Sequence, residues 1–249
     1  MKAIILAAGK GERMGTETEN KPKCMIKYKG KAIIDYILEA FYSCGIDDII
    51  IVNGYKNNIL EKYLENKNVN FITNNNYNNT NMVYSLICAE AQMTDDLIVS
   101  YSDIIYKKNV LNSLINNESE FVVTIDKNWL DLWNLRMDDP LLDAETMKIN
   151  DNGNIIELGK KPLSYQDIQG QYIGLFKISS SVLEKVRVFY HSLDKSNQYD
   201  GNNFNNMYMT TFIQLIIDRL LPIKADLIEG GWLEFDTKLD LASYNSYSL

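Results

Sequence analysis

The sequence of 249 residues predicts an α/β fold in which a mostly parallel sheet is flanked by helices. Two observations lead to this prediction. Apolar strand patterns alternate with helical patterns along the chain, as they do in repeated strand–helix–strand units. Several of the strands are almost wholly apolar, which is typical of strands buried on both faces of a parallel sheet. There is no internal repeat and no long linker, so we expect one domain over residues 1–249.

The first strand, residues 2–6, ends abruptly in the small-residue loop Ala7-Ala8-Gly9-Lys10-Gly11. A helix over residues 32–44 follows, with apolar residues at helical spacing and Gly45 as a candidate C-cap. The other elements are expected, in chain order, as strand 49–52, helix 57–65, strand 68–73, helix 82–87, strand 97–103, helix 107–115, strand 121–126, short strands near 147, 155–156 and 172–178, helices 179–191 and 206–220, and a strand within 230–237. In such a sheet, ligands bind at the carboxyl ends of the strands.

The composition is that of a cytosolic enzyme. A formal net charge of −8, from 25 basic and 33 acidic residues, argues against binding to nucleic acids or to anionic membranes. No stretch approaches the ~20 apolar residues of a membrane span, and no signal-peptide pattern precedes Lys2. We therefore expect a cytoplasmic protein. Three widely spaced cysteines and a single histidine, His191 in an expected helix, argue against a disulfide framework, a zinc site and His-dependent nucleophilic catalysis.

The glycine loop after the first strand has the properties of a polyphosphate site. Four cations lie within or close behind it, namely Lys10, Arg13, Lys21 and Lys23. Glycines allow backbone N–H groups to approach an anion closely, and the cations add charge. A dinucleotide fingerprint would need a glycine in place of Met14, and a P-loop would need Gly-Lys-Ser/Thr, so neither of these loops fits. The alternative is an ordinary strand turn with surface lysines.

Carboxylates end two of the expected strands. Asp103 ends strand 97–103, where it is either a Mg²⁺ ligand or a cap of the next helix. Because Mg²⁺ takes only one or two protein carboxylates, an isolated aspartate is sufficient. Glu234 and Asp236 alternate onto one face of a strand, and they could be acid/base catalysts. A second metal ligand is the more economical role.

Two further segments carry candidate binding residues. The asparagine-rich stretch 74–81 precedes the helix at 82–87, so an Asn or Thr there is expected to cap free N–H groups that can also face a nucleobase or phosphate. In the segment 127–140, Trp129, Trp133 and Arg136 share one helical face. This face could be packing that fixes a small β-rich lid over residues 127–178, or it could contact a ligand. Aromatic rings suit a quaternary ammonium group, whereas Arg136 suits a carboxylate.

These motifs together carry a family resemblance over nearly the whole chain. The loop 6–14, Lys21-Pro22-Lys23, Asp103, Gly159-Lys160-Lys161 and Trp232-x-Glu234-x-Asp236 occur in the order found in the sugar-phosphate nucleotidyltransferase-like superfamily. The chain resembles its small cytidylyltransferase branch, which includes phosphocholine and aminoethylphosphonate cytidylyltransferases. Segments 126–129, 157–161, 171–177 and 206–210 are most similar to phosphoglutamine cytidylyltransferases of capsule phosphoramidate synthesis. Met14 replaces the leucine often found after the loop arginine, which is a mild apolar change.

The resemblance implies an enzyme with a Rossmann-like nucleotidyltransferase sheet, Mg²⁺ as cofactor, and CTP and a small phosphorylated acceptor as partners. The best candidate acceptor is L-glutamine phosphate, with phosphocholine and 2-aminoethylphosphonate as alternatives. A nucleotide-binding regulator without turnover and an interaction domain of a larger assembly are more distant alternatives. No role in binding nucleic acid or membrane is implied, and enzymes of this type often form homodimers.

The same resemblance assigns the site residues. Catalytic roles fall to Arg13, Lys23 and one or both of Lys160 and Lys161. Nucleotide binding is assigned to Leu6, Ala7, Ala8, Gly9, Lys10, Gly11, Glu12, Arg13, Lys23, Thr80, Asn81, Ser85 and Ser102. Acceptor binding is assigned to Lys127, Trp129, Trp133, Arg136, Lys160, Lys161, Tyr172 and Gly174. Asp103 and Asp236 would hold the metal, with Glu234 as a third candidate.

Overall fold

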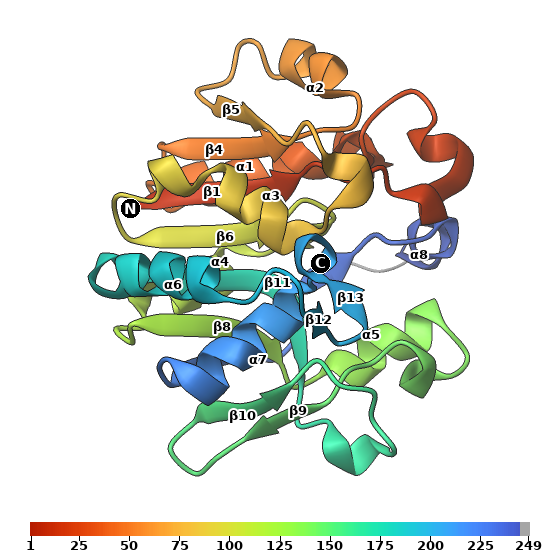
Figure 1. The fold of residues 1–249 in the computed structure, drawn as a ribbon. Helices are drawn as coiled ribbons and strands as arrows, with labels where there is room; N and C mark the ends of the chain where they lie inside the picture. Colours follow the sequence, from red (N-terminus) through yellow and green to blue (C-terminus); the bar gives the residue numbers. More distant parts are fainter. Residues whose placement is uncertain (245–249) are drawn as a thin grey trace.

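A nine-stranded sheet runs through the centre of the computed structural model, which describes residues 1–244 (Figure 1). The strand order is β5-β4-β1-β6-β11-β8-β14-β10-β9. The strands are β1 (Lys2–Ala7), β4 (Ile49–Asn53), β5 (Asn70–Thr73), β6 (Leu97–Tyr101), β8 (Phe121–Asp126), β9 (Met147–Ile149), β10 (Asn154–Leu158), β11 (Gln171–Ile178) and β14 (Ile223–Ile228). Three strand pairs fall outside this sheet: β2 (Lys27–Tyr28) with β3 (Lys31–Ala32), β7 (Ile104–Tyr106) with β15 (Trp232–Glu234), and β12 (Gln198–Tyr199) with β13 (Asn202–Asn203).

The sheet is mostly parallel, as the sequence predicts. Strands β5, β4, β1 and β6 pair in parallel, and so do β8 and β14. Strand β11 is antiparallel to both β6 and β8, and β10 is antiparallel to both β14 and β9. Of the nine strands, only β10 and β11 therefore run against the common direction in the described part of the chain. The reversed strand β11 joins two blocks of parallel strands into one sheet.

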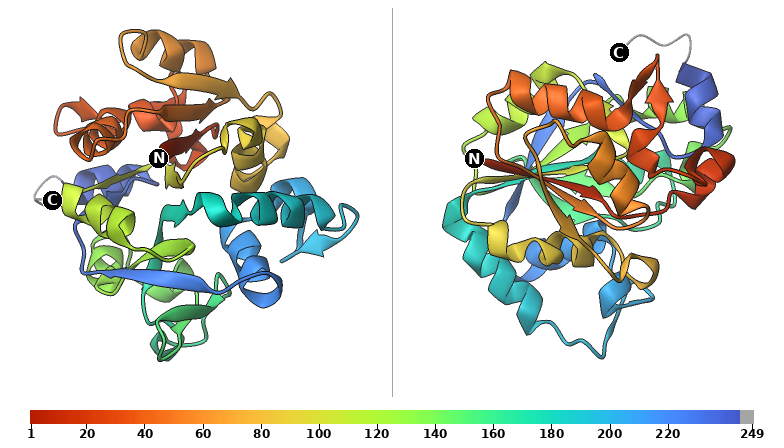
Figure 2. Two further views of the ribbon diagram at one scale, coloured as in Figure 1. Left: turned by 90° about the vertical axis from the view of Figure 1, so that its left-hand side faces the viewer. Right: turned by 90° about the horizontal axis from the view of Figure 1, so that it is seen from above.

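Helices cover both faces of the sheet, and Figure 2 shows these layers from two further sides. The helices are α1 (Ile33–Ser43), α2 (Asn57–Tyr63), α3 (Met82–Cys88), α4 (Lys108–Asn116), α5 (Trp129–Arg136), α6 (Ser180–Ser192), α7 (Met209–Arg219) and α8 (Lys238–Ser243). Apolar residues of α1, α4 and α5 form one core cluster, and those of α3, α6 and α7 form the other. No helix within residues 1–244 is both long and apolar enough to cross a membrane.

The apolar strands supply both cores, because successive side chains point to opposite faces. In β1, Ala3, Ile5 and Ala7 belong to the cluster with α1. Ile4 and Leu6 belong to the cluster with α3. The same division holds along β4 and explains why these strands contain almost no polar residue. The strand end is thereby held rigidly between two layers, which positions the glycine loop that follows.

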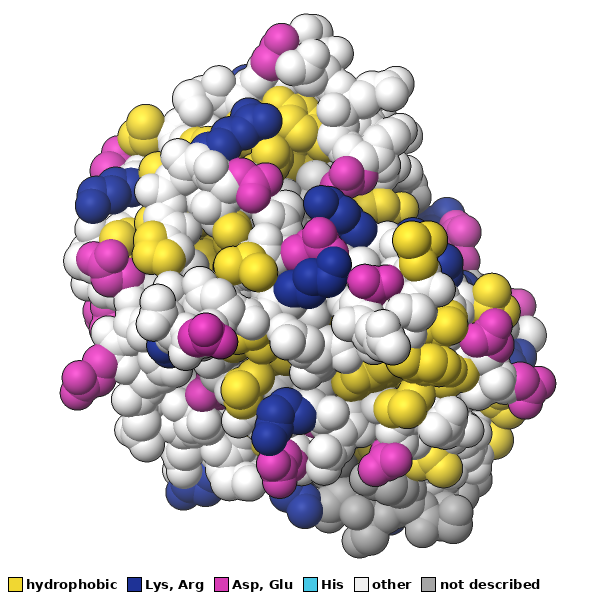
Figure 3. Space-filling model, turned by 90° about the horizontal axis from the view of Figure 1, so that it is seen from below, with side chains coloured by type: hydrophobic (Ala, Val, Ile, Leu, Met, Phe, Trp, Pro, Cys, Tyr) yellow, Lys and Arg dark blue, Asp and Glu magenta, His cyan; other side chains and the backbone are white. Residues whose placement is uncertain are grey.

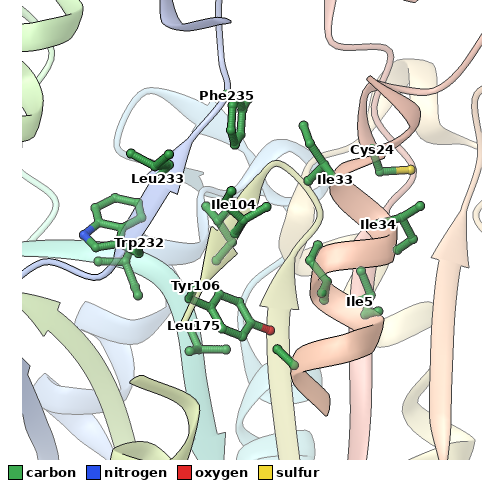
Figure 4. Packing of buried hydrophobic residues seen from close by; sticks show 14 of the residues in the cluster. Ile5, Cys24, Ile33, Ile34, Ile104, Tyr106, Leu175, Trp232, Leu233 and Phe235 are labelled. Atoms are coloured by element: carbon green, nitrogen blue, oxygen red, sulfur yellow. The ribbon is translucent and has the colours of Figure 1, made fainter. Parts of the chain in front are cut away.

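The short ladder between β7 and β15 lies outside the main sheet and was not predicted. Glu234 pairs with Ile104, and the N–H of Phe235 donates to the carbonyl of Asp103 over 2.8 Å. The apolar side chains of Ile104, Leu233 and Phe235 belong to the core cluster that also contains residues of α1 (Figure 4). This packing anchors the ladder, and the ladder brings a segment from the end of the chain next to the end of β6.

The segment 127–178 contributes to the far half of the same sheet. It contains α5, β9, β10 and β11, of which β9 and β10 form the sheet edge. A hairpin turn at Asp151-Asn152-Gly153 joins β9 to β10, with Gly153 at a φ of 73°. Strands β9 and β10 thus extend the central sheet, and β11 lies within it. The role of the segment as an acceptor-binding lid stays a prediction.

Candidate active site

The glycine loop and Asp103 meet at one edge of the sheet because β1 and β6 are parallel neighbours. Leu6 pairs with Tyr101, so the loop from residue 8 onwards and Ser102-Asp103 leave the sheet side by side. The β7–β15 ladder then places Asp236 opposite Asp103, although the two residues are far apart in the sequence. The structure therefore joins the two aspartates that the family resemblance paired.

Lys23 connects the two aspartates. Its Nζ donates to Asp103 Oδ2 over 2.7 Å and to Asp236 Oδ1 over 2.8 Å. The other oxygen of Asp236 lies 2.5 Å from Nη1 of Arg13, whose side chain is 69% exposed. Burial alone would lower the pKa of Lys23, but the two carboxylates outweigh burial and raise this pKa above its ordinary value. Lys23 therefore stays positively charged, and it keeps two carboxylates together that would otherwise repel each other.

Gly11 makes room for Lys23. Its φ is +64°, in the left-handed region, and a Cβ at this position would lie 2.9 Å from the Cβ of Lys23. A side chain at position 11 would therefore be strained by the backbone and would also displace Lys23. Gly30 offers a comparison, because its φ is +83° but a Cβ added there would meet no atom within 4 Å.

We expect Gly11→Ala to lose both stability and turnover, and Gly30→Ala to lose stability alone. Each change forces alanine into the left-handed region at a cost of about 1–2 kcal/mol in the free energy of unfolding. Only Gly11→Ala also pushes on Lys23. Thermal unfolding together with steady-state kinetics checks this expectation. Equal turnover in the two variants would mean that the close approach of Gly11 to Lys23 does not matter.

The first pocket lies over the glycine loop and has a volume of about 390 Å³. It is lined by Leu6, Ala8, Gly9, Gly11, Glu12, Arg13, Lys23, Tyr77, Thr80, Asn81, Met82, Ser85, Ser102, Asp103 and Asp236. Of the residues predicted to bind nucleotide, only Ala7 and Lys10 are not in this lining. Ala7 faces the core cluster with α1, and Lys10 lies 3.6 Å from Glu12 at the surface. The sequence did not single out Tyr77 and Met82.

Asn74 hydrogen-bonds to two polar residues that line this pocket. Its side chain is buried and donates to the hydroxyls of Thr80 and Ser85 over 2.9 and 3.0 Å. The Oδ1 of Asn81 accepts from the N–H of Met82, so Asn81 caps α3 as predicted. Asn74 follows directly on β5, and this strand-end position is the signal that could have identified it.

A second pocket of about 350 Å³ adjoins the first. It is lined by Arg13, Asn81, Met82, Tyr101, Asp103, Trp133, Asp143, Glu145, Gln171, Tyr172, Tyr208, Met209, Thr210, Glu234 and Asp236. Five of these residues also line the first pocket, namely Arg13, Asn81, Met82, Asp103 and Asp236. The two pockets therefore share a wall that contains both aspartates and the loop arginine.

Two of the residues predicted to bind the acceptor, Trp133 and Tyr172, line this second pocket. Trp129 is buried against the rings of Trp133 and Tyr165, which is the packing role considered for this helix. The buried Gly174 lies against the ring of Tyr101, and its φ is +82°. Helix α5, which carries Trp129 and Trp133, therefore both packs against the core and reaches the second pocket.

The predicted basic acceptor residues lie outside both linings. Lys127 pairs with Glu229 over 3.0 Å. Lys160 is 60% exposed, lies 3.6 Å from Glu157 and borders a separate pocket by α6 and α7. Lys161 donates to the carbonyls of Leu141 and Leu142. Arg136 is buried and paired with Glu234 and Asp240. Contact of any of these residues with an acceptor stays a prediction.

Glu145 is a pocket residue that sequence reasoning missed. The buried side chain of Gln171 clamps its backbone, accepting from the N–H of Glu145 over 3.0 Å and donating to its carbonyl over 2.5 Å. Burial, with the nearby carboxylates of Asp143 and Glu234, raises the pKa of Glu145 to about 7. Glu145 lies in an irregular stretch just before β9, and a single sequence gives no periodic signal there.

The aspartates of the shared wall fit a magnesium ion. The Oδ1 of Asp103 is buried without a hydrogen-bond partner in the described part of the chain, and it belongs to the hard oxygen donors that Mg²⁺ prefers. No cluster of three or more His, Cys, Asp or Glu side chains suited to a metal is present within residues 1–244. Because Mg²⁺ usually takes one or two carboxylates and completes its shell with phosphate oxygens and water, such a cluster is not required.

The fold and the site together define a class of protein. A glycine loop with an arginine and a lysine faces two aspartates at strand ends, which suits transfer of part of a nucleoside triphosphate. The chain belongs to the MobA-like NTP transferase domain family, which matches residues 3–149. It is a nucleotidyltransferase, and the family resemblance noted in the sequence is confirmed.

Individual relatives agree with this assignment. The CTP:phosphoglutamine cytidylyltransferase of Campylobacter jejuni subsp. jejuni is 47% identical over 248 residues, which cover 97% of this chain and 98% of the relative. A choline-phosphate cytidylyltransferase of Haemophilus influenzae is 24% identical over 238 residues, which cover 90% of this chain and 99% of the relative.

Two solved structures share the fold. One is the CTP:phosphocholine cytidylyltransferase from Streptococcus pneumoniae, with a TM-score of 0.74 and 24% identity over 97% of this chain and 96% of that chain. The other is the inositol-1-phosphate CTP transferase from T. maritima, with a TM-score of 0.75 and 19% identity over 100% of this chain and 98% of that chain. At these identities the two structures support the fold alone.

Proposed function

We propose that the protein transfers CMP from CTP to phosphoglutamine, which releases pyrophosphate and gives a CDP-linked product. One observation carries the proposal: two pockets share a wall that contains Arg13, Asp103 and Asp236. A nucleotide in the first pocket and a phosphorylated acceptor in the second would meet at this wall. The 47% identity to CTP:phosphoglutamine cytidylyltransferase, over nearly all of both chains, supports the choice of both substrates.

The proposed reaction is a direct displacement. An oxygen of the acceptor's phosphoryl group attacks the α-phosphorus of CTP, a new P–O bond forms, and the bond to the bridging oxygen of pyrophosphate breaks. The attacking oxygen is already anionic, so no side chain has to act as a nucleophile. The protein must hold two mutually repelling anions together and neutralise the charge that builds on the phosphates.

The chain's own cations are suited to this task. The loop amides and Arg13 would bind the β- and γ-phosphates, because the exposed guanidinium of Arg13 stands beside the loop. Lys23 lies deeper, between the two aspartates, and would be the cation near the α-phosphate. Mg²⁺ is the proposed cofactor; Asp103 and Asp236 would hold it, with Glu234 as a further candidate, and when bound it would neutralise phosphate charge of both substrates.

The second pocket suits an acceptor that carries an amine. Over the face in Figure 3, Lys and Arg side chains lie among Asp and Glu side chains. The second pocket differs, because five carboxylates line it and Arg13 is the only basic residue among its described lining. Four of these carboxylates have partners: Asp103 and Asp236 accept from Lys23, Asp143 accepts from the indole of Trp133, and Glu234 lies 2.5 Å from Nη1 of Arg136. Within residues 1–244 no basic side chain pairs with Glu145, which accepts a hydrogen bond from Thr210, and the rings of Tyr101 and Tyr172 stand in the same lining. An ammonium group would give this carboxylate a charged partner.

The proposal is tested by pyrophosphate release with CTP and three acceptors compared directly: L-glutamine phosphate, phosphocholine and 2-aminoethylphosphonate. We expect the highest kcat/KM with L-glutamine phosphate. Replacing CTP by UTP or ATP should lower the rate with every acceptor. A preference for phosphocholine would overturn the proposed acceptor but keep the reaction, whereas no release with any acceptor would overturn the reaction.

Glu145→Gln should specifically weaken recognition of the acceptor's α-amino group. The change keeps the shape of the side chain and removes its charge, so we expect kcat/KM for L-glutamine phosphate to fall ~10–100-fold, from loss of a charge-assisted hydrogen bond. The KM for CTP should not change. Phosphorylated glutaramate, which lacks the α-amino group, should be used equally by both enzymes. Glu61→Gln is the matched control, because Glu61 accepts from Asn53 outside both pockets. A Glu145→Gln enzyme with unchanged selectivity would contradict this role.

A further inference from the structure

A buried network of hydrogen bonds and ion pairs fixes Glu234, the last residue of β15, and Asp236, which follows two residues later. Asp240, which is 1% exposed, accepts through Oδ2 from the N–H groups of Asp236 and Thr237, both over 2.7 Å. The N–H of Asp240 donates in return to the hydroxyl of Thr237 over 3.4 Å. Asp240 thus caps the start of α8 and also fixes the backbone from which the side chain of Asp236 extends.

Arg136 of α5 joins this cap to Glu234. Its Nε donates to Asp240 Oδ1 over 3.2 Å, and its Nη1 lies 2.5 Å from Glu234 Oε2. The guanidinium stands over the ring of Trp133, 5.0 Å from the ring centroid. Burial alone would lower the pKa of Arg136, but Glu234, together with Tyr244 and Asp240, raises the pKa above its ordinary value. One guanidinium therefore connects α5 to Glu234 of β15 and to Asp240, the residue that fixes the backbone of Asp236.

We propose that Arg136 is a positioning residue for two carboxylates, Glu234 of the second pocket and Asp236 of the shared wall. Through its direct ion pair it aims Glu234 into the second pocket. Through Asp240 it fixes the turn that presents Asp236 to Lys23 and Arg13. Arg136 itself lines neither pocket, so it acts through these two residues and not on a substrate. The expected effect of Arg136 on metal affinity rests on the proposed metal site. The expected effect on turnover requires only that nucleotidyl transfer takes place at the shared wall.

The chemistry of the guanidinium explains why the position holds arginine. Arginine presents its nitrogens in a rigid plane, and here Nε donates to Asp240 while Nη1 forms an ion pair with Glu234. Lysine would supply the same charge from a single point and could not keep both arms in this geometry. Arg136→Lys therefore separates the loss of geometry from the loss of charge.

The experiment measures Mn²⁺ affinity by calorimetry in the presence of CTP, together with steady-state kinetics and thermal unfolding. Mn²⁺ stands in for Mg²⁺ as the probe. In Arg136→Lys we expect the Mn²⁺ affinity to fall about 10-fold and kcat to fall ~10–100-fold, as is typical when partners of ligating side chains are lost. The KM for CTP should change less than ~3-fold, because Arg136 does not line the first pocket. Asp240→Asn should move the same quantities in the same direction, and it supplies the test should Arg136→Lys fail to fold.

Arg187→Lys is the matched control. Arg187 also contacts two carboxylates, Glu184 at 2.9 Å and Glu90 at 4.0 Å, but on α6 and outside both pockets. We expect wild-type kinetics and Mn²⁺ affinity from this variant. Wild-type Mn²⁺ affinity and kcat in a folded Arg136→Lys enzyme would overturn the positioning role. Absence of Mn²⁺ binding to the wild type would instead overturn the proposed metal site, and the effect on kcat would then decide the positioning role alone.

Discussion

Asp103→Asn is expected to reduce turnover by ~10²–10³ at saturating Mg²⁺ and CTP. Loss of one charged contact to the transition state is typically worth ~3–4 kcal/mol, which corresponds to this factor. The carboxylate of Asp103 contacts Lys23, and its second oxygen is buried without a partner among the described residues, so Asp103 stands at the centre of the shared wall. Asparagine keeps the shape and can still accept from Lys23, so the temperature of unfolding should hardly change. Single-turnover kinetics and thermal unfolding check both expectations.

Asp226→Asn provides the comparison for this result. Asp226 is a buried aspartate that lies on β14, bonds to Ser113 and lines neither pocket. Its substitution should leave turnover intact. Full activity of Asp103→Asn at saturating Mg²⁺ would remove Asp103 from the reaction.

Lys23→Met is expected to lower kcat ~10²–10³-fold while weakening CTP binding only a few-fold. Charge at the α-phosphate builds mainly in the transition state, so a cation placed there contributes more to turnover than to ground-state binding. The variant also leaves Asp103 and Asp236 facing each other without the ammonium group that joins them. Equilibrium binding of CTP and kcat, measured on the same preparation, separate the two effects.

Lys177→Met controls for the removal of a lysine whose ammonium group is hydrogen-bonded inside the protein. Lys177 is buried, and its ammonium group donates to the carbonyls of Ile115 and Asn117, away from both pockets. The substitution should affect stability and leave kcat unchanged. If Lys23→Met lost CTP affinity in proportion to kcat, the lysine would be a binding residue without a particular role in the transition state.

Much of the first pocket could be predicted because its parts are local in the sequence. The apolar run of β1 specifies a buried strand, the glycine loop follows it directly, and Asp103 follows an apolar strand of the same kind. Neighbouring parallel strands end at the same edge of a sheet, so the residues that follow these strands were expected to lie together. The capping role of Asn81 also follows from a local pattern, whereas the pattern over 127–140 is irregular and indicated at most a helical turn where α5 lies.

The second pocket could not be predicted in the same way, because its residues come from distant elements without regular spacing. Glu145 precedes β9, Gln171 begins β11 and Thr210 lies in α7, and only the folded sheet edge brings them together. The basic residues Lys160 and Lys161 were assigned to the acceptor by resemblance, yet both lie outside this lining. The charge of Lys160 and Lys161 in the sequence does not tell where in the fold their side chains lie.

The ladder between β7 and β15 has a consequence for the order in which the enzyme becomes competent on the ribosome. The glycine loop, Lys23 and Asp103 are synthesised early, whereas Asp236 arrives 133 residues after Asp103 (236 − 103). Because chains emerge and fold from the N-terminal side, the nucleotide cradle can form before its second aspartate exists. A nascent chain at that stage would hold a nucleotide without the partner that restrains Lys23. We therefore expect turnover to begin only when β15 docks, so the onset of catalysis depends on a segment synthesised long after the glycine loop.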